Sequence, residues 1–440
     1  MKQLDDGLIL RSLAEGTPRD KTQLSKFYLD VFIEAYGPED EWIGPWADDL
    51  LAASHPTVTD DDVWVVIDPT QDDRIVSALL LIPQTWRYET LSFGVGRVEL
   101  VATHKDYRDR GLVRELFAAL HARSKALGHS IQAITGIPYF YRQFGYAMAV
   151  DLGTSAAIPF EAIPELKEDE APFCHLRPAT EADIPAMMAW EEMFAARHLL
   201  SHLRPQCLWE YEMTRRNKAT VRAVQYHIIV DKGGRDIGYI TTERTAYQRN
   251  ITFLEYAVGP EASYLQTYDD VLRSIRDYAL NNYEGQVPYY IRVGSGLYPT
   301  LQPLLEKTGI VPPRPTTYSW YIRVPDMVQF LTDLKPILEQ RLSGSLAHRY
   351  TGELKIQLYS RRGLYMRFED GCIVAIDDRR PEIEKEDAAF PYHTFLNVVF
   401  GHRTVQQLAA VLPDVGTNRK GQILLDVLFP PKPSWLVPLA

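Results

Sequence analysis

The residues with the most chemical potential lie in the segment 97–128. Its first part is typical of a strand, and leucines then recur at helical spacing up to a glycine. The turn YRDRGL between them puts Arg108, Arg110 and Gly111 at the helix start. The first amides of a helix have no partner within it and its N-terminal end is positive, so this turn could bind a phosphate. Gly111 has no Cβ, which lets a phosphate approach the backbone.

An Arg-x-x-Gly turn is not specific by itself, because many such turns only carry a solvated arginine beside a bend. The residues that follow add information. After the helix come an apolar strand, SIQAITGI, and the aromatic stretch PYFYRQFGY. Tyr141 in this stretch could donate a proton. The ordinary alternative is that it only packs in a core, as we expect for Tyr139 and Tyr146.

These motifs, in this order, resemble those of the GNAT acyltransferases. That family has an Arg/Gln-x-x-Gly-x-Gly/Ala turn after a strand, followed by a Tyr-x-x-Phe-Gly-Phe/Tyr segment. The chain matches with RDRGLV at residues 108–113 and YRQFGY at residues 141–146. Val113 departs from the small residue that is usual at the third position of the turn motif.

The resemblance implies acetyl-CoA as co-substrate and gives roles to named residues. Val101 and Thr103 would hold the pantetheine arm through backbone groups of the strand, and one N–H would polarise the thioester carbonyl. Tyr141 would be the general acid that protonates the departing sulfur. The residues implied for pyrophosphate binding are Arg108, Arg110, Gly111 and Leu112.

Composition narrows the function classes. At 440 residues the chain suggests roughly three domains of about 150 residues. A net charge of -11 argues against nucleic acid or an anionic membrane as partner and is compatible with a small cation. Three distant cysteines without metal-ligand spacing predict no metal site. No long apolar run or signal-peptide pattern occurs, so we expect a cytoplasmic protein.

Changes of pattern along the chain predict three domains. Residues 1–155 follow the GNAT order, and a linker rich in proline and glutamate follows them. Residues 174–325 repeat this spacing, with LRPATEAD matching LRSLAEG, but Ser263 and Gln266 replace the arginine and glycine of the turn, so this copy is degenerate. Residues 326–440 resemble the sterol-carrier-protein-like domain that ends acyltransferases of the enhanced intracellular survival (Eis-type) family.

The fold class expected is therefore α+β. It comprises two tandem GNAT folds, each a mixed, splayed β-sheet with flanking helices, followed by the sterol-carrier-protein-like α+β domain.

Two groups compete for the general base. Glu99 lies on the strand where GNAT enzymes often carry a carboxylate. Resemblance to the Eis-type family implies the C-terminal carboxylate instead, here that of Ala440 at the end of the apolar tail PSWLVPLA. The ordinary alternative is that this tail merely covers the last domain. The sequence leaves the choice open.

The function expected is acetyl-CoA-dependent N-acetyl transfer to a primary amine, in a ternary complex and without a covalent intermediate. Resemblance to the aminoglycoside-modifying members of the family implies a small, polycationic acceptor. The resemblance also implies a homo-oligomer, often a hexamer. Two alternatives stay open. One is a carrier protein for an apolar ligand that uses the GNAT fold as a scaffold, and the other is a protein or peptide N-acetyltransferase.

Overall fold

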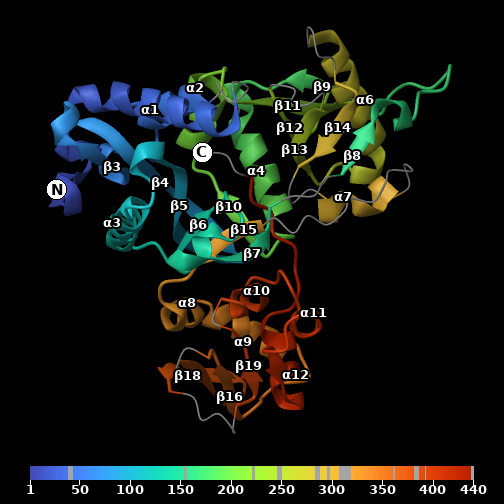
Figure 1. Cartoon of the computed structure of the whole chain (residues 1–440). Coiled ribbons are helices and arrows are strands. Elements are labelled where there is room, and N and C mark those ends of the chain that lie inside the picture. The colour runs from blue at the N-terminus through green and yellow to red at the C-terminus, as the bar shows by residue number, and fades with distance from the viewer. Residues whose placement is uncertain are drawn as a thin grey trace.

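The computed structural model describes residues 1–37, 43–152, 156–220, 223–244, 250–282, 288–294, 298–306, 319–359, 362–380, 386–391 and 393–437. In this part of the chain the fold is mixed α+β, with three β-sheets and flanking helices. Figure 1 shows two units beside each other, one blue to teal and one green to yellow, and a third, orange to red, below them.

The first sheet has the strand order β1-β2-β3-β4-β5-β6-β15-β7. Its longest strands, β4 (Arg74–Tyr88) and β5 (Leu91–Thr103), are antiparallel, and β5 pairs in parallel with β6 (Ile131–Ile134). Strand β4 reads as a continuous apolar run because helices cover both of its faces. The other elements of this unit are β1 (Lys2–Gln3), β2 (Ile9–Ser12), α1 (Pro18–Tyr36), α2 (Ile43–Leu51), β3 (Val63–Asp68), α3 (Leu112–Ala126) and β7 (Ala147–Asp151).

Strand β5 bends away from β6 near its end. Leu100 has φ +50, and the register with β4 slips at this point, which marks a β-bulge. Pairing with β6 stops at Val98 and Ile134, whereas β5 continues to Thr103. Within the described residues, the last part of β5 therefore has no strand partner on that edge, and the sheet opens in front of α3.

The second sheet has the order β8-β14-β13-β12-β11-β9. Its central strands repeat the arrangement of the first sheet, since β13 is antiparallel to β12 and parallel to β14, with a register slip near Thr241. The elements here are β8 (Ala157–Pro159), β9 (Cys174–Pro178), α4 (Ile184–Ala195), α5 (Gln206–Glu210), β11 (Val224–Asp231), β12 (Asp236–Glu243), β13 (Asn250–Val258), α6 (Tyr264–Asn282), β14 (Tyr290–Val293) and α7 (Tyr298–Leu305).

Some strands cross between the two units. Strand β15 (Ser319–Arg323) follows the second unit in sequence but pairs with β6 and β7 in the first sheet. Strand β10 (Leu200–Leu203) extends the first sheet by pairing with β4. Strand β8, from the segment expected to be a linker, pairs with β14. The sheets therefore share strands across the sequence ranges expected for the domains.

The third unit contains the sheet β18-β17-β16-β19-β20 and short helices. From it the C-terminal segment runs back toward the other two units, as the red trace in Figure 1 shows. Trp435 of this segment bridges Ser201 in parallel and is buried in the core of the second unit. The elements are α8 (Met327–Asp333), α9 (Lys335–Ser343), β16 (Gly352–Gln357), β17 (Gly363–Glu369), β18 (Cys372–Arg379), β19 (Ala388–Ala389), α10 (Phe395–Val399), α11 (Val405–Ala409), β20 (Gly416–Thr417) and α12 (Arg419–Leu428).

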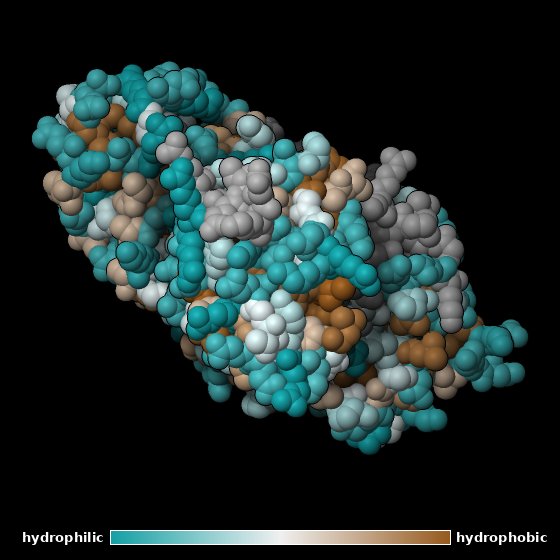
Figure 2. Space-filling view, turned by 90° about the horizontal axis from the view of Figure 1, so that it is seen from below, coloured by the Kyte–Doolittle hydropathy of each residue, from teal (hydrophilic) through white to brown (hydrophobic). Residues whose placement is uncertain are grey.

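The face seen in Figure 2 is largely hydrophilic, with apolar side chains in several small groups. Among the helices that the structure describes, none combines the length and apolarity needed to cross a bilayer.

Candidate active site

A cavity of about 670 Å³ lies where the first sheet opens. Helix α1, the end of β5, the turn before α3 and the loop after β6 form its walls. The structure brings together here most of the residues predicted from the motifs: Val101, Thr103, Arg108, Arg110, Gly111, Leu112 and Tyr141.

The entrance of α3 presents unpaired backbone amides to this cavity. Gly111 occupies the N-cap position with φ +74 and has no side chain to cap the helix. In the described part of the chain, the amides of Leu112 and Val113 donate to no acceptor. A Cβ on Gly111 would meet nothing within 4 Å, so neighbouring atoms do not require a glycine here. Glycine is favoured because the backbone is left-handed, and it also keeps the path of an anion to the amides clear.

The two arginines of the turn differ in what they contact. Arg108 is exposed and has no ion-pair partner among the described residues. The guanidinium of Arg110 lies 4.9 Å from the centre of the Tyr107 ring, and its Nη2 donates to the Asp106 carbonyl at 3.1 Å. Arg108 is therefore available to an anion, whereas Arg110 also stiffens the turn.

Tyr107 anchors the turn to the end of β3. Its hydroxyl donates to Asp68 Oδ2 at 2.6 Å. Hydrogen bonds from the hydroxyls of Thr70 and Tyr107 lower the pKa of the Asp68 carboxyl to about 2, so this acceptor is ionised at neutral pH. The position of the turn is thus fixed by a charge-assisted hydrogen bond.

Tyr141 is buried and lines the same cavity as the turn. Its ring packs beside Phe117, with ring centres 6.0 Å apart. On another side it is packed against Gly136, where a Cβ would come within 2.9 Å of the Tyr141 hydroxyl oxygen. Tyr141 therefore belongs to an aromatic cluster and is also placed to act on a ligand in the cavity.

Glu99 is held in a buried ion pair. Its side chain is 8% exposed, and the fully buried Arg97 donates to it from Nε at 3.0 Å. The Arg97 guanidinium lies 5.5 Å from the centre of the Trp320 ring. Glu99 is not among the residues that line the 670 Å³ cavity. Its role as a base stays a prediction.

Ala440, the other predicted base, lies outside the described residues, which end at Val437. The tail before it packs well beyond the third unit. The backbone N–H of Trp435 donates to the Leu200 carbonyl at 2.8 Å, and the centre of the Trp435 ring lies 4.7 Å from that of His202. Val437 lines a second cavity, of about 420 Å³, between β4 and the segment 202–212.

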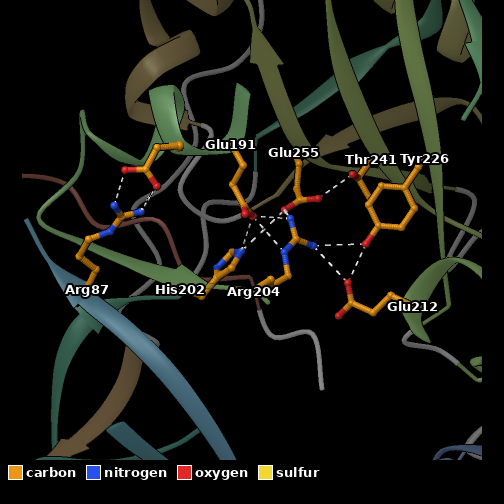
Figure 3. Close-up of polar contacts among 9 residues, drawn as sticks. Arg87, Glu191, His202, Arg204, Glu212, Tyr226, Thr241 and Glu255 are labelled. Atoms are coloured by element: carbon orange, nitrogen blue, oxygen red, sulfur yellow. Dashed lines mark hydrogen bonds and ion pairs between the residues drawn. The ribbon is translucent and has the colours of Figure 1, made fainter. Parts of the chain in front are cut away.

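Sequence reasoning missed a buried ionic cluster in the second unit, shown in Figure 3. The Arg204 guanidinium donates to Glu191 at 2.9 Å, to Glu255 at 2.7 Å and to Glu212 at 3.2 Å. His202 Nε2 lies 3.2 Å from Glu191. All these residues are buried. No local motif marks them, because they come from α4, the segment 202–212 and β13, which only the fold brings together.

Electrostatics within the cluster follow from burial and from Arg204. Burial raises the pKa of the Glu255 carboxyl above its ordinary value. Burial also opposes ionisation of Glu191, but the charge of Arg204 and the hydrogen bond with His202 outweigh it and lower the pKa of the Glu191 carboxyl. Ligand atoms of Glu191, His202 and Glu255 lie within 4.8 Å of one another, a spacing that a metal ion could use. Here the guanidinium of Arg204 supplies the positive charge between the two carboxylates.

The helix entrance of the second unit is closed by its own side chains. Ser263 Oγ accepts a hydrogen bond from the Gln266 N–H at 3.3 Å. The Tyr264 hydroxyl donates to the Tyr256 carbonyl of β13 at 3.2 Å, and its oxygen also hydrogen-bonds to the Val258 backbone. The side chain of Tyr264 thus occupies the end of β13, and that of Ser263 lies at the start of α6.

One protein family matches the sequence. Residues 21–149 match the sequence model described as an acetyltransferase (GNAT) domain. The match includes the end of β5, the turn, α3 and Tyr141. No curated protein matches the chain. The chain therefore carries a GNAT N-acetyltransferase domain, and the predicted enzyme class is confirmed.

Solved structures resemble the whole fold. A GCN5-related N-acetyltransferase from Anabaena variabilis is similar with a TM-score of 0.67 and 12% identity, over 98% of this chain and 99% of that one. One from Kribbella flavida gives a TM-score of 0.62 and 14% identity, over 98% and 97%. Eis1 from Mycobacterium abscessus gives a TM-score of 0.58 and 14% identity, over 97% and 98%. At these identities the likeness concerns the fold.

Proposed function

We propose that this protein is an Eis-type, acetyl-CoA-dependent N-acetyltransferase that acts on a primary amine of a small, polycationic acceptor of the aminoglycoside kind. The observation that carries the proposal is one cavity that joins the open entrance of α3, the unpaired end of β5 and Tyr141. These features match the three parts of an acetyl-CoA site, namely the diphosphate, the pantetheine arm and the thioester.

Binding of the donor follows from the backbone. The pyrophosphate lies against the amides of Leu112 and Val113, where the helix dipole is positive, and Arg108 adds an exposed cation. The pantetheine arm adds to the free edge of β5 at Val101 and Thr103, as a strand would. Arg110 contributes mainly by keeping the turn rigid.

The transfer itself is a direct displacement. The unprotonated amine nitrogen attacks the thioester carbonyl, and a β5 amide stabilises the negative charge that develops on its oxygen. A base takes the surplus proton from the nitrogen as the N–C bond forms. The C–S bond then breaks, and the sulfur takes the hydroxyl proton of Tyr141, which regains one from solvent. The products are the acetylated amine and free CoA.

Two bases remain in the proposal. Glu99 is close in sequence to the proposed pantetheine edge but is bound by Arg97. The direction of the tail favours the Ala440 carboxylate as the base. At Trp435 the tail runs parallel to β10, and β10 is antiparallel to β4. That direction leads along β4 toward Leu80, which faces Glu99. Replacing Glu99 by Gln and deleting residues 439–440, in separate variants, will show which change flattens the rate at neutral pH.

The Eis-type assignment includes a tandem architecture. The strand orders of the first two sheets support two GNAT-like folds, and β8 takes beside β14 the place that β15 takes beside β6. Tyr264 covers the strand edge of the second copy, which supports its lack of a CoA site. The third unit would be the sterol-carrier-protein-like domain. The assignment also implies a cytoplasmic homo-oligomer, up to a hexamer.

The test is CoA release, followed with a thiol reagent, for acetyl-CoA with a panel of amines that includes aminoglycosides, polyamines and peptides. We expect the polycationic small amines to give the fastest turnover. Faster turnover of peptides would redirect the assignment to protein acetylation.

Calorimetry with CoA tests the donor site itself. Arg108→Glu should weaken binding at least tenfold, because it reverses the charge next to a diphosphate. Arg419→Glu, at an exposed position in α12, is the matched control and should bind as the wild type does. Absence of CoA binding by the wild type, together with binding of apolar ligands, would support the carrier function instead.

A further inference from the structure

The loop that carries Tyr141 packs against β15, a strand that follows the second unit in sequence. Strand β15 pairs with β6 on one edge and with β7 on the other. Its side chains alternate between the two faces of the sheet. Trp320 and Ile322 join the core shared with the third unit, whereas Tyr321 joins the core under α3, where Tyr141 lies.

Tyr321 makes two contacts with the loop. Its hydroxyl oxygen accepts a hydrogen bond from the Tyr139 N–H at 2.5 Å. Its ring meets that of Tyr141 edge to face, with centres 5.5 Å apart and planes at 68°. Tyr321 is 1% exposed, so its ring contact with the buried Tyr141 is shielded from water, and its hydrogen bond to Tyr139 is partly buried.

The hydrogen bond acts at the most constrained point of the loop. Tyr139 has φ +71 and ψ -32, which is unfavourable for a bulky residue unless surrounding contacts enforce it. The prediction that Tyr139 packs in a core is wrong, since the residue is 75% exposed and its own side chain gives the backbone little support. The bond to Tyr321 therefore stabilises the reversal that sets the direction of the next residues, Tyr141 among them.

The same strand supports the other end of the loop. Arg323 lies two residues after Tyr321 and donates to Gln132 at 2.7 Å. Its Nε is 3.3 Å from the point where Gly145 would carry a Cβ. Tyr141 is thus enclosed between Gly136, Tyr321 and the rest of the loop, with one side left toward the cavity.

We propose that Tyr321 is a positioning residue for acetyl transfer, which fixes the loop so that the Tyr141 hydroxyl stands at the departing sulfur. The inference rests on the proposed function, in which Tyr141 gives its proton to that sulfur. On this inference, strand β15, which follows the second unit in sequence, helps to build the active site of the first unit.

The test compares Tyr321→Phe with Tyr141→Phe and with the double variant. Tyr321→Phe keeps the ring and loses only the hydrogen bond to Tyr139, so kcat should fall roughly tenfold while KM for acetyl-CoA stays unchanged. When Tyr141→Phe is already present, the same change should cause no further loss, because the group that it positions is gone.

Tyr28→Phe is the matched control. Tyr28 is as buried as Tyr321, and its hydroxyl has no hydrogen-bond partner in the described part of the chain, so kcat should stay at the wild-type level. Thermal unfolding confirms that each variant is folded.

The two proposals fail in different ways. A wild-type protein that releases no CoA with any amine would overturn the proposed function and this inference with it. A wild type that is active, with Tyr141→Phe inactive and Tyr321→Phe fully active, would overturn the inference alone. Equal losses from Tyr321→Phe with and without the Tyr141→Phe substitution would also overturn it, because they indicate a general structural effect.

Discussion

The entrances of α3 and α6 follow strands in equivalent places of two similarly ordered sheets, yet they offer opposite conditions to a ligand. At α3, Gly111 has no side chain over the first amides, and within the described residues the end of β5 has no strand partner on the edge that faces β6. At α6, Ser263 caps the helix and the Tyr264 hydroxyl occupies the backbone of β13. In the described part of the chain the first two amides of each helix donate to no acceptor, so the two entrances differ in the side chains beside them and not in the pairing of these amides.

This difference shows how a binding fold can become a structural one. Buried backbone groups must be hydrogen-bonded either to a ligand or to the protein. Tyr264 of α6 supplies such a partner, because its hydroxyl donates to the Tyr256 carbonyl of β13. The anion site is therefore distinguished by the absence of a side chain at Gly111 and by the arginines of the turn, and not by the strand order or the unpaired amides alone.

The largest effect that we expect concerns the arginines of the two units. Arg108 is exposed, whereas Arg204 is buried among three carboxylates. Arg204→Met should lower the free energy of unfolding by about 3–5 kcal/mol, because it leaves buried negative charges without a counterion. Urea unfolding measures this change, and CoA affinity of the folded protein should be unaffected.

Arg177→Met is the control for that experiment. Arg177 also pairs with two carboxylates, Asp183 and Asp236, but its side chain is 34% exposed. Its replacement should cost at most about 1 kcal/mol. Equal losses of unfolding free energy in the two variants would show that the buried cluster stabilises the second unit no more than the exposed ion pairs do.

Substitutions at the two helix entrances test the comparison directly. Gly111→Val should weaken CoA binding roughly tenfold or more, because it places a branched side chain at φ +74 in the path of the diphosphate. Ser263→Ala should leave CoA binding unchanged and cost about 1 kcal/mol of stability through the lost cap. Calorimetry and thermal unfolding on both variants separate these effects. Weaker CoA binding by Ser263→Ala would contradict the assignment of the donor site to the first unit.

Mild acid should affect both units in the same direction. Burial lowers the pKa of His129 in the first unit and of His227 in the second to about 4. The unfolded chain then takes up more protons than the folded one below pH 6.5, so stability falls as the pH decreases toward 4. Each histidine should cost about 1.4 kcal/mol at pH 5.5, one unit below its unfolded value.

Urea unfolding at pH 7.5 and 5.5 measures this smaller effect. Asp183, whose pKa Arg177 holds at about 2, does not interfere, because its contribution is lost only below about pH 4. His227→Gln should reduce the pH dependence by one histidine. An unchanged dependence in that variant would mean that His227 is protonated in the folded state as well.

The sequence was most informative where the relevant residues are neighbours in the chain. The strand, the turn with Arg108 and Gly111, and the following helix could be predicted because periodicity and a glycine at a helix start act locally. The enzyme class follows from these motifs and is confirmed by the family match. The structure places Tyr141 in the same cavity, while its role as the acid stays a prediction.

Features that depend on distant segments could not be predicted. The pairing of β15 with β6 joins residues near 320 to residues near 133, and strand periodicity says nothing about which sheet accepts a strand. The cluster around Arg204 likewise depends on several separate elements. The general base, the oligomeric state and the acceptor stay predictions that rest on resemblance.

The return of β15 to the first sheet also constrains how the protein can be made. During synthesis the acetyltransferase unit remains incomplete until residues 319–323 have left the ribosome, with β6 and β7 lacking the strand that belongs between them. A fragment cut after β7 would expose these open edges and be prone to aggregate. Expression of the matched domain alone should therefore fail, unless the missing strand is supplied as a separate peptide.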